Sequence, residues 1–249
     1  MNRRNFLLLS TLSPLFAKDY VELNQDVNLH INDLKILYTL DSRLKKLRRY
    51  IGFANFNIVS LDQALYYGRN YSAIGKFSKE ELQLIEKLFY SEPNKFGFYG
   101  DKTVDNISQK IAKRDIQKIS HSGHFIFKGK PLEDYNRILK DVGDNLILTT
   151  GIRNVVKQLS LYISKVKSLN GNLSQASNVI APPAYTYHAI SDFDVGKKGW
   201  GNRNFTSEFA RTEGSLTTAT SEYVQPKALS VTKQVYVPAE SPVIVALDP

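Results

Sequence analysis

Apolar residues in the first half of the chain recur with the period of an α-helix. An apolar face with three- and four-residue spacing predicts a helix over Asp41–Gly52. The residues on this face are Leu44, Leu47 and Ile51. Ser60 stands where an N-cap would, so a second helix is expected over Leu61–Tyr67. Residues 18–40 mix apolar and polar positions, and we expect a docking arm or a short strand there.

Stronger signals of helix boundaries follow. Residues 78–81 read Ser-Lys-Glu-Glu, the pattern of a capping box, and an apolar face continues through Leu82, Ile85 and Phe89. Residues 119–128 resemble a strand or a hairpin. Pro131 opens another expected helix, which ends at Gly143 and turns Leu132, Tyr135 and Leu139 inward.

The third quarter of the chain predicts a strand, a turn and a helix in close succession. Leu146–Thr150 is an apolar run with the length of a buried strand, residues 151–153 form a turn, and Val155–Leu169 is an amphipathic helix. Helices followed by mixed strands and helices indicate an α+β fold. We expect a helical N-terminal part packed on a small, mainly antiparallel sheet.

The composition divides the chain into four parts. The expected boundaries are a leader at 1–17, a helical region at 18–130, a core at 131–211, and a tail at 212–249. This tail is rich in Thr, Ser and Ala and then alternates like a strand, so we expect a β-rich or flexible extension, or an altered coding sequence.

The first 17 residues have the organisation of a secretory signal. Arg3 and Arg4 precede a short apolar run, and Ala17 is the expected cleavage point. The arginine pair resembles a twin-arginine signal, with an ordinary secretion signal as the alternative. The apolar run is shorter than the roughly 20 residues that span a bilayer. We therefore expect an exported, periplasmic protein with no integral membrane segment once the signal is removed.

Charge and cysteine content narrow the chemistry. The net charge is +9, or 9 − 2 = 7 without the two leader arginines. Such a basic excess suits a polyanionic neighbour, which could be nucleic acid, a membrane surface or the bacterial wall, and a plain solvated surface is the alternative. The chain has no cysteine and four histidines, so disulfides and thiolate ligands are excluded, and a metal site must use His, Asp or Glu.

Two segments carry residues suited to binding a peptide and a metal. Arg153 follows the expected strand, and Gln158 lies one turn further on. An Arg at a strand end can hold a terminal carboxylate through paired hydrogen bonds. His188 is followed by Asp192 and Asp194, and a nitrogen and an oxygen ligand of this kind suit zinc.

These segments resemble the VanY-like D-alanyl-D-alanine carboxypeptidases of the lysostaphin, D-Ala-D-Ala-peptidase and hedgehog group, over roughly residues 130–210. The resemblance implies a zinc hydrolase that cleaves peptidoglycan stem peptides, so these peptides, and not nucleic acid, are the expected partner. It makes Arg153 and Gln158 substrate-binding residues and makes His188 and Asp194 zinc ligands. Asp194 lies six residues after His188 where the family has seven, so Asp192 is a competing ligand.

The second half of the family's site has no match. No histidine follows His188, so the Glu-x-x-His that supplies the third ligand and the general base is missing, and the catalytic base is unknown. Downstream carboxylates that could replace it are Glu208, Glu213 and Glu222, and Trp200 could line a groove. His121 and His124 are expected to be structural. The resemblance thus predicts impaired activity, with a non-catalytic peptidoglycan-binding protein as the alternative.

Overall fold

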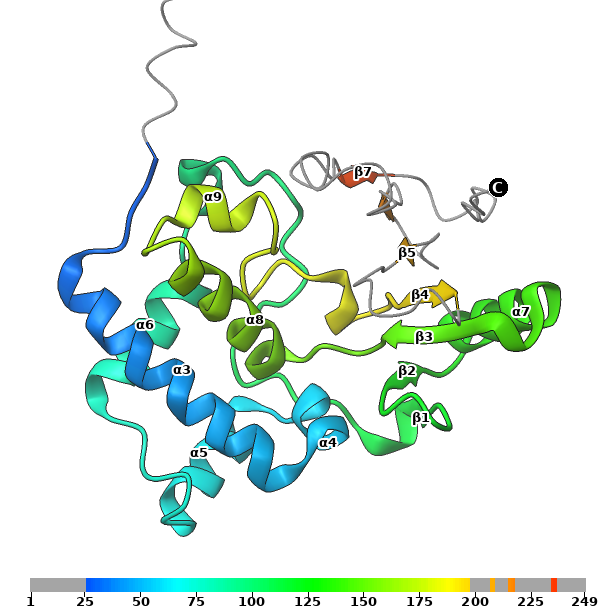
Figure 1. Ribbon diagram of the computed structural model, residues 1–249, viewed down its shortest axis with the longest axis horizontal. Coiled ribbons are helices and arrows are strands. Elements are labelled where there is room, and N and C mark those ends of the chain that lie inside the picture. Colours follow the sequence, from blue (N-terminus) through cyan, green and yellow to red (C-terminus); the bar gives the residue numbers. More distant parts are fainter. Residues whose placement is uncertain (1–25, 198–206, 209–214, 218–233, 237–249) are drawn as a thin grey trace, which may run out of the picture.

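A computed structural model describes residues 26–197, 207–208, 215–217 and 234–236, and within them the fold is a mixed α+β arrangement, as predicted (Figure 1). Seven α-helices are present in this part of the chain. They are α3 (Ile31–Ile51), α4 (Phe53–Ile58), α5 (Leu61–Asn70), α6 (Lys79–Phe89), α7 (Lys130–Val142), α8 (Val155–Ser168) and α9 (Leu173–Ser177). Single 3-10 turns are η1 (Pro93–Phe96), η2 (Lys113–Asp115), η3 (Gly143–Asn145) and η4 (Tyr187–Ala189).

The strands are short and antiparallel. The hairpin expected over residues 119–128 begins earlier than predicted, because β1 (Ile116–Lys118) lies before that range and pairs with β2 (Phe125–Phe127). The three-stranded sheet has the order β3 (Leu146–Thr150), β4 (Asp194–Lys197), β5 (Ser207–Glu208), and β6 (Ser215–Thr217) pairs with β7 (Gln234–Tyr236). An irregularity between Leu148 and Thr150 places Thr150 opposite Asp194.

Helix α3 begins ten residues before the predicted start. His30 caps it by accepting a hydrogen bond from the Asn32 amide, and the apolar face continues upstream through Leu37 and Leu40. Of the arm expected at residues 18–40, residues 31–40 belong to α3, and the described residues before them form one isolated bridge, between Asn28 and Asn172. Asp41, the first residue of the predicted helix, lies inside α3 and is buried. Its ion pair with Lys167, 126 residues further along the chain, is invisible in the local pattern and stabilises the carboxylate there.

The other helix boundaries lie closer to the predicted ones. The capping boxes at Ser60 and Ser78 are both formed, and α7 and α8 span nearly the predicted residues. Helix α5 continues past Gly68 to Asn70, because Gly68 lies against the Phe77 ring and is buried there. Glycine at this point serves close packing and does not end the helix.

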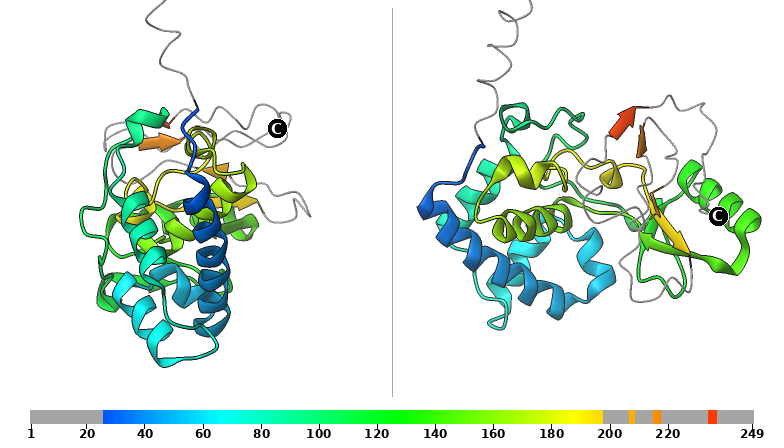
Figure 2. Two further views of the ribbon diagram at one scale, coloured as in Figure 1. Left: turned by 90° about the vertical axis from the view of Figure 1, so that its left-hand side faces the viewer. Right: turned by 45° about the horizontal axis from the view of Figure 1, so that its top comes forward.

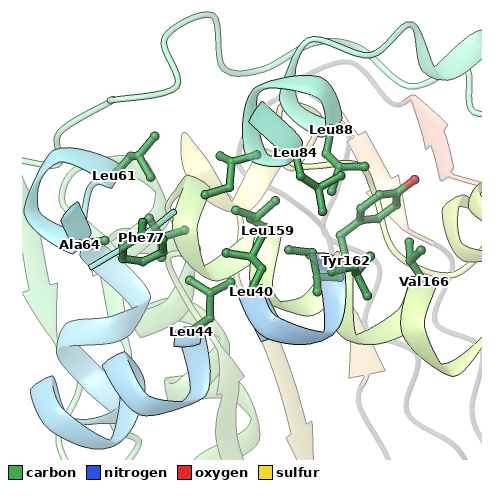
Figure 3. Close-up of a cluster of buried hydrophobic side chains, with 14 of the residues drawn as sticks. Leu40, Leu44, Leu61, Ala64, Phe77, Leu84, Leu88, Leu159, Tyr162 and Val166 are labelled. Atoms are coloured by element: carbon green, nitrogen blue, oxygen red, sulfur yellow. The ribbon is translucent and has the colours of Figure 1, made fainter. Parts of the chain in front are cut away.

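The main core lies between α3, α5, α6 and α8, and Figure 3 shows part of it. Helix α8 contributes Leu159, Tyr162 and Val166, which face Leu40 and Leu44 of α3 and Leu84 and Leu88 of α6. Each fully buried aliphatic side chain contributes about 1.5–3 kcal/mol relative to exposure. The helical part therefore packs mainly on α8, and not on the sheet as expected.

A second core joins α7 to the strands. Tyr135 packs edge-to-face on Phe193 at 5.9 Å between ring centroids, beside Leu146, Leu148 and Val195. In Figures 1 and 2 this layer lies at one end of the molecule, beyond the N-terminal end of α8. The division at residue 130 stays a prediction, and the main core contains residues from both sides of it.

Within the described residues, no helix has both the length and the apolar character needed to cross a bilayer. The predicted leader at 1–17 lies outside the described residues, as does most of the tail at 212–249.

Candidate functional site

The turn between β3 and α8 positions Arg153. A Cβ at Gly151 would lie 2.0 Å from the Phe125 carbonyl oxygen, so only glycine allows this approach to β2. The Ile152 amide donates to the same carbonyl at 2.8 Å. Asn154 then caps α8, and its side-chain amide donates to the carbonyls of Ile58 and Gln109. The turn is thus tied to the hairpin and to the helical part at once.

His188 is held on the other side of this turn. The Arg153 amide donates to the His188 carbonyl at 3.0 Å. The ring Nδ1 lies 3.1 Å from the Gly151 carbonyl and 3.2 Å from the Asp192 carbonyl. Because carbonyls only accept, Nδ1 carries a proton and its hydrogen bonds fix the ring. This leaves Nε2 directed at Asp194.

Asp194 lies between Arg153 and His188. Its Oδ2 accepts a hydrogen bond from Arg153 Nη2 at 2.9 Å, and its Oδ1 is 3.4 Å from His188 Nε2. Thr150, opposite Asp194 in the sheet, also accepts from Arg153 Nη2, at 3.1 Å. The side chains of His188 and Asp194 are almost fully buried, and that of Arg153 is 17% exposed. The structure therefore brings three of the four predicted site residues together.

The spacing of His188 and Asp194 fits a zinc ion. Zinc held about 2.1 Å from a nitrogen and an oxygen at the tetrahedral angle separates those atoms by about 3.4 Å. His188 Nε2 and Asp194 Oδ1 are 3.4 Å apart. A backbone carbonyl on Nδ1 is the usual outer partner of a zinc-binding histidine. The two residues thus fit as two zinc ligands. The same separation also fits an ion pair between a protonated His188 and Asp194.

Asp192 contacts His188 through its backbone, whereas Asp194 contacts it through its carboxylate. It reaches the His188 ring through its backbone carbonyl, and its Oδ1 accepts a hydrogen bond from Ser191 at 3.1 Å. The carboxylate seen beside His188 Nε2 is that of Asp194. The geometry favours Asp194 over Asp192 as the partner of His188.

Gln158 lies apart from the cluster. It is buried in α8, and its Nε2 donates to the Ala181 carbonyl at 2.7 Å, which holds the Pro182-Pro183 segment on the helix. Its Oε1 is buried without a hydrogen-bond partner in the described part. A contact with substrate stays a prediction for this residue.

A third zinc ligand is not found among the described residues, where no three His, Asp or Glu side chains gather as a metal site would require. Glu208 is paired through its backbone position with Asp194, across β4 and β5. Trp200, Glu213 and Glu222 lie outside the described residues. His121 is an exposed turn residue with φ of 61°.

Sequence reasoning missed Lys157 and gave His124 only a structural role. Both are buried near the cluster, and the charges of Arg153, Asp194 and His188 all act on His124. Burial, together with the charges of Lys157 and Arg153, lowers the pKa of His124 to about 4. Lys157 lies in the first turn of α8 and Arg153 precedes that helix, so no helical spacing links the two residues in the sequence.

Comparisons with protein-family models, curated proteins and solved structures found no match. The functional argument therefore depends on the residues and their geometry.

Proposed function

We propose that this chain is an exported, zinc D-alanyl-D-alanine carboxypeptidase-like protein that binds peptidoglycan stem peptides in the periplasm. The observation that carries the proposal is the convergence of Arg153 with His188 and Asp194 from two separate segments, with His188 and Asp194 at the separation of two zinc ligands. The basic charge of the chain and the signal-like first 17 residues support a place beside the wall.

Arg153 would bind the terminal carboxylate of the peptide. Its guanidinium is partly exposed, and in the described part only Nη2 is engaged, by Thr150 and Asp194. Nη1 is left to donate to a ligand. Holding the carboxylate there places the last peptide bond near His188 and Asp194, and positioning of this kind lowers the barrier.

Bound zinc would polarise the scissile carbonyl and lower the pKa of water to about 7. His188 would hold it through Nε2, oriented by the Gly151 and Asp192 carbonyls, and Asp194 through Oδ1. Asp194 Oδ2 can keep its hydrogen bond to Arg153 meanwhile, which ties the carboxylate-binding residue to the metal ligand.

The same observations favour reduced catalysis. Two ligands hold zinc more weakly than three, and the absence of a general base costs about 10²–10⁴-fold in rate. We expect weak zinc binding and slow release of D-alanine. A non-catalytic peptidoglycan-binding protein is the second candidate, favoured by the two-ligand count in the described part of the chain.

Zinc content after dialysis, zinc titration and D-alanine release from a D-Ala-D-Ala peptide test this proposal. His188→Ala and Asp194→Asn should each abolish the weak zinc binding, while Asp192→Asn, the matched control, should keep it. Arg153→Met should weaken peptide binding about 10–100-fold, since charged hydrogen bonds are lost. If zinc binds unchanged to both His188→Ala and Asp194→Asn, the proposed site is wrong.

Peptide binding separates the two candidates. An enzyme should release D-alanine in proportion to bound zinc, and Glu208→Gln is the first variant to test for loss of a base, because of its register with Asp194. A binding protein should bind the peptide equally well with a chelator present and release nothing. A wild-type chain that retains stoichiometric zinc and turns over rapidly would contradict the predicted impairment.

A further inference from the structure

The ring of Phe53 is surrounded by three nitrogen-bearing side chains from different parts of the chain. The Arg48 guanidinium carbon lies 5.1 Å from the ring centroid and Lys157 Nζ lies 5.4 Å from it. The His124 imidazole packs edge-on at 5.0 Å. Gly123 allows this approach, because a Cβ there would lie 3.1 Å from the Phe53 ring.

Lys157 is a buried cation with no ion-pair partner among the described residues. Its exposed fraction is 9%, and within the described residues it forms no ion pair or hydrogen bond, only the contact with Phe53. Burial lowers the pKa of Lys157 to about 8, helped by the charges of Arg153 and Arg48. A charge in this setting costs free energy unless an anion binds beside it.

His124 adds a neutral donor. Asn57 Nδ2 lies 3.4 Å from His124 Nδ1 and 3.5 Å from the Gly123 carbonyl, which assigns the amide nitrogen to this side. An amide nitrogen only donates, so Nδ1 accepts and the proton of the neutral ring is on Nε2. No hydrogen bond from Nε2 is found in the described part of the chain.

These three groups place nitrogen donors around the Phe53 ring. Arg48 is exposed at the end of α3 and has no ion pair among the described residues. Lys157 lies in the first turn of α8, where the helix dipole also favours an anion. Arg153 lies one turn before Lys157, so the donor set adjoins the carboxylate-binding residue. Phe53, 37% exposed, offers an apolar face for a short methylene stem.

We propose that Arg48, Lys157 and His124 form a second anion subsite around Phe53, which binds a side-chain carboxylate of the same wall peptide whose terminal carboxylate is bound by Arg153. The proposal rests on the proposed function for the identity of the peptide. An acidic residue such as a glutamyl unit supplies both the carboxylate and the methylene stem. The subsite makes the protein selective for stem peptides with a free acid upstream of the terminal dipeptide.

Two peptides that differ in one group test the selectivity. Both end in D-Ala-D-Ala, and an upstream glutamyl residue carries either a free carboxylate or a primary amide. By calorimetry, the wild-type chain should bind the acid about tenfold more tightly than the amide. Lys157→Met and Arg48→Met should each reduce this ratio toward one, whereas Arg153→Met should weaken both peptides and keep the ratio.

A second measurement does not depend on the peptide. An amine-reactive reagent should modify Lys157 at pH 8, and mass spectrometry measures the modification. Glutarate should protect Lys157 from the reagent but should leave the exposed Lys46 unprotected. If glutarate protects Lys157 but no wall peptide binds to the protein, the anion subsite is supported and the proposed function is wrong. An equal affinity of the wild type for acid and amide, a ratio unchanged in both Met variants, or no protection by glutarate would each overturn the subsite.

Discussion

Gly151 is the residue on which the candidate site depends most directly, since its carbonyl contacts His188 and its Cα faces β2. We predict that Gly151→Ala lowers the free energy of unfolding by about 3 kcal/mol, because the new Cβ meets the backbone oxygen of Phe125 at 2.0 Å. Urea unfolding measures this. Gly97→Ala is the control: its φ is +85° but the space is open, so about 1 kcal/mol is expected. A loss below that of the control would contradict the prediction.

Lys157 makes stability depend on pH in an unusual direction. Its folded pKa, about 8, is below the ordinary value of 10.5, so the folded state releases the proton first. The destabilisation is fully present below pH 8 and disappears as pH rises toward 10.5. Lys157→Met should therefore unfold at higher urea than the wild type at pH 7, with a difference that shrinks by pH 10.5. A difference that is constant over this range would contradict the assignment.

Among single residues, the sequence pattern led to Arg153, His188 and Asp194, whereas it gave His124 only a structural role and did not point to Lys157. The first three belong to recognisable segments, and their contacts follow from one sheet and one turn. The surroundings of Phe53 combine α3, the 121–124 turn and α8, which only the tertiary structure brings together. No local pattern contains that information.

Among the elements, α3 and α8 are joined by a buried carboxylate. Asp41 on α3 accepts hydrogen bonds from Lys45, from Lys167 at 2.8 Å and from Ser164 at 3.2 Å. Burial alone would raise the pKa of Asp41, but the two lysines outweigh it and lower the pKa. The carboxylate stabilises the folded state above its ordinary pKa, and this contribution is lost as pH falls through the lowered value.

We predict that Asp41→Asn costs about 3 kcal/mol at pH 7, because two cations lose their buried partner. Asp33→Asn, which breaks the more exposed Asp33–Lys87 pair, should cost less than about 1 kcal/mol. Thermal or urea unfolding of the two variants provides the comparison. Equal losses would show that Asp41 does not join the helices as described.

Elements with their own boundary signals were predictable. The capping boxes at Ser60 and Ser78 and the Pro131 start depend on neighbouring residues, so the sequence contains them. The first ten residues of α3 were missed because the helix was predicted to begin at Asp41, whose long-range pairing inside α3 is invisible in the local pattern.

For the whole molecule, the packing of the helical part on α8 was the largest departure from expectation. An amphipathic face shows that a helix packs on a partner but does not identify that partner. Helix α8 has enough buried residues to pack against α3, α5 and α6 together. The sheet keeps its own core with α7. The α+β class could be predicted, while the arrangement of its layers could not.

The export route predicted for the whole protein can be tested at its two leader arginines. If the twin-arginine interpretation holds, replacing both Arg3 and Arg4 with Lys should block or sharply reduce appearance of the protein outside the cytoplasm, measured by fractionation. Normal export of the double variant would exclude that route and leave ordinary secretion.

The pairing of α3 with α8 also has a consequence for how the chain is made. Asp41 contacts Ser164 and Lys167 at separations of 123 and 126 residues, so the ribosome must synthesise most of the described chain before α3 can pack on α8. Until then, α5 and α6 can cover only part of the apolar face of α3, and the part that packs on α8 is open to other nascent chains and to chaperones. Contacts this distant also slow folding after release. The helical half is thus synthesised first but completed late.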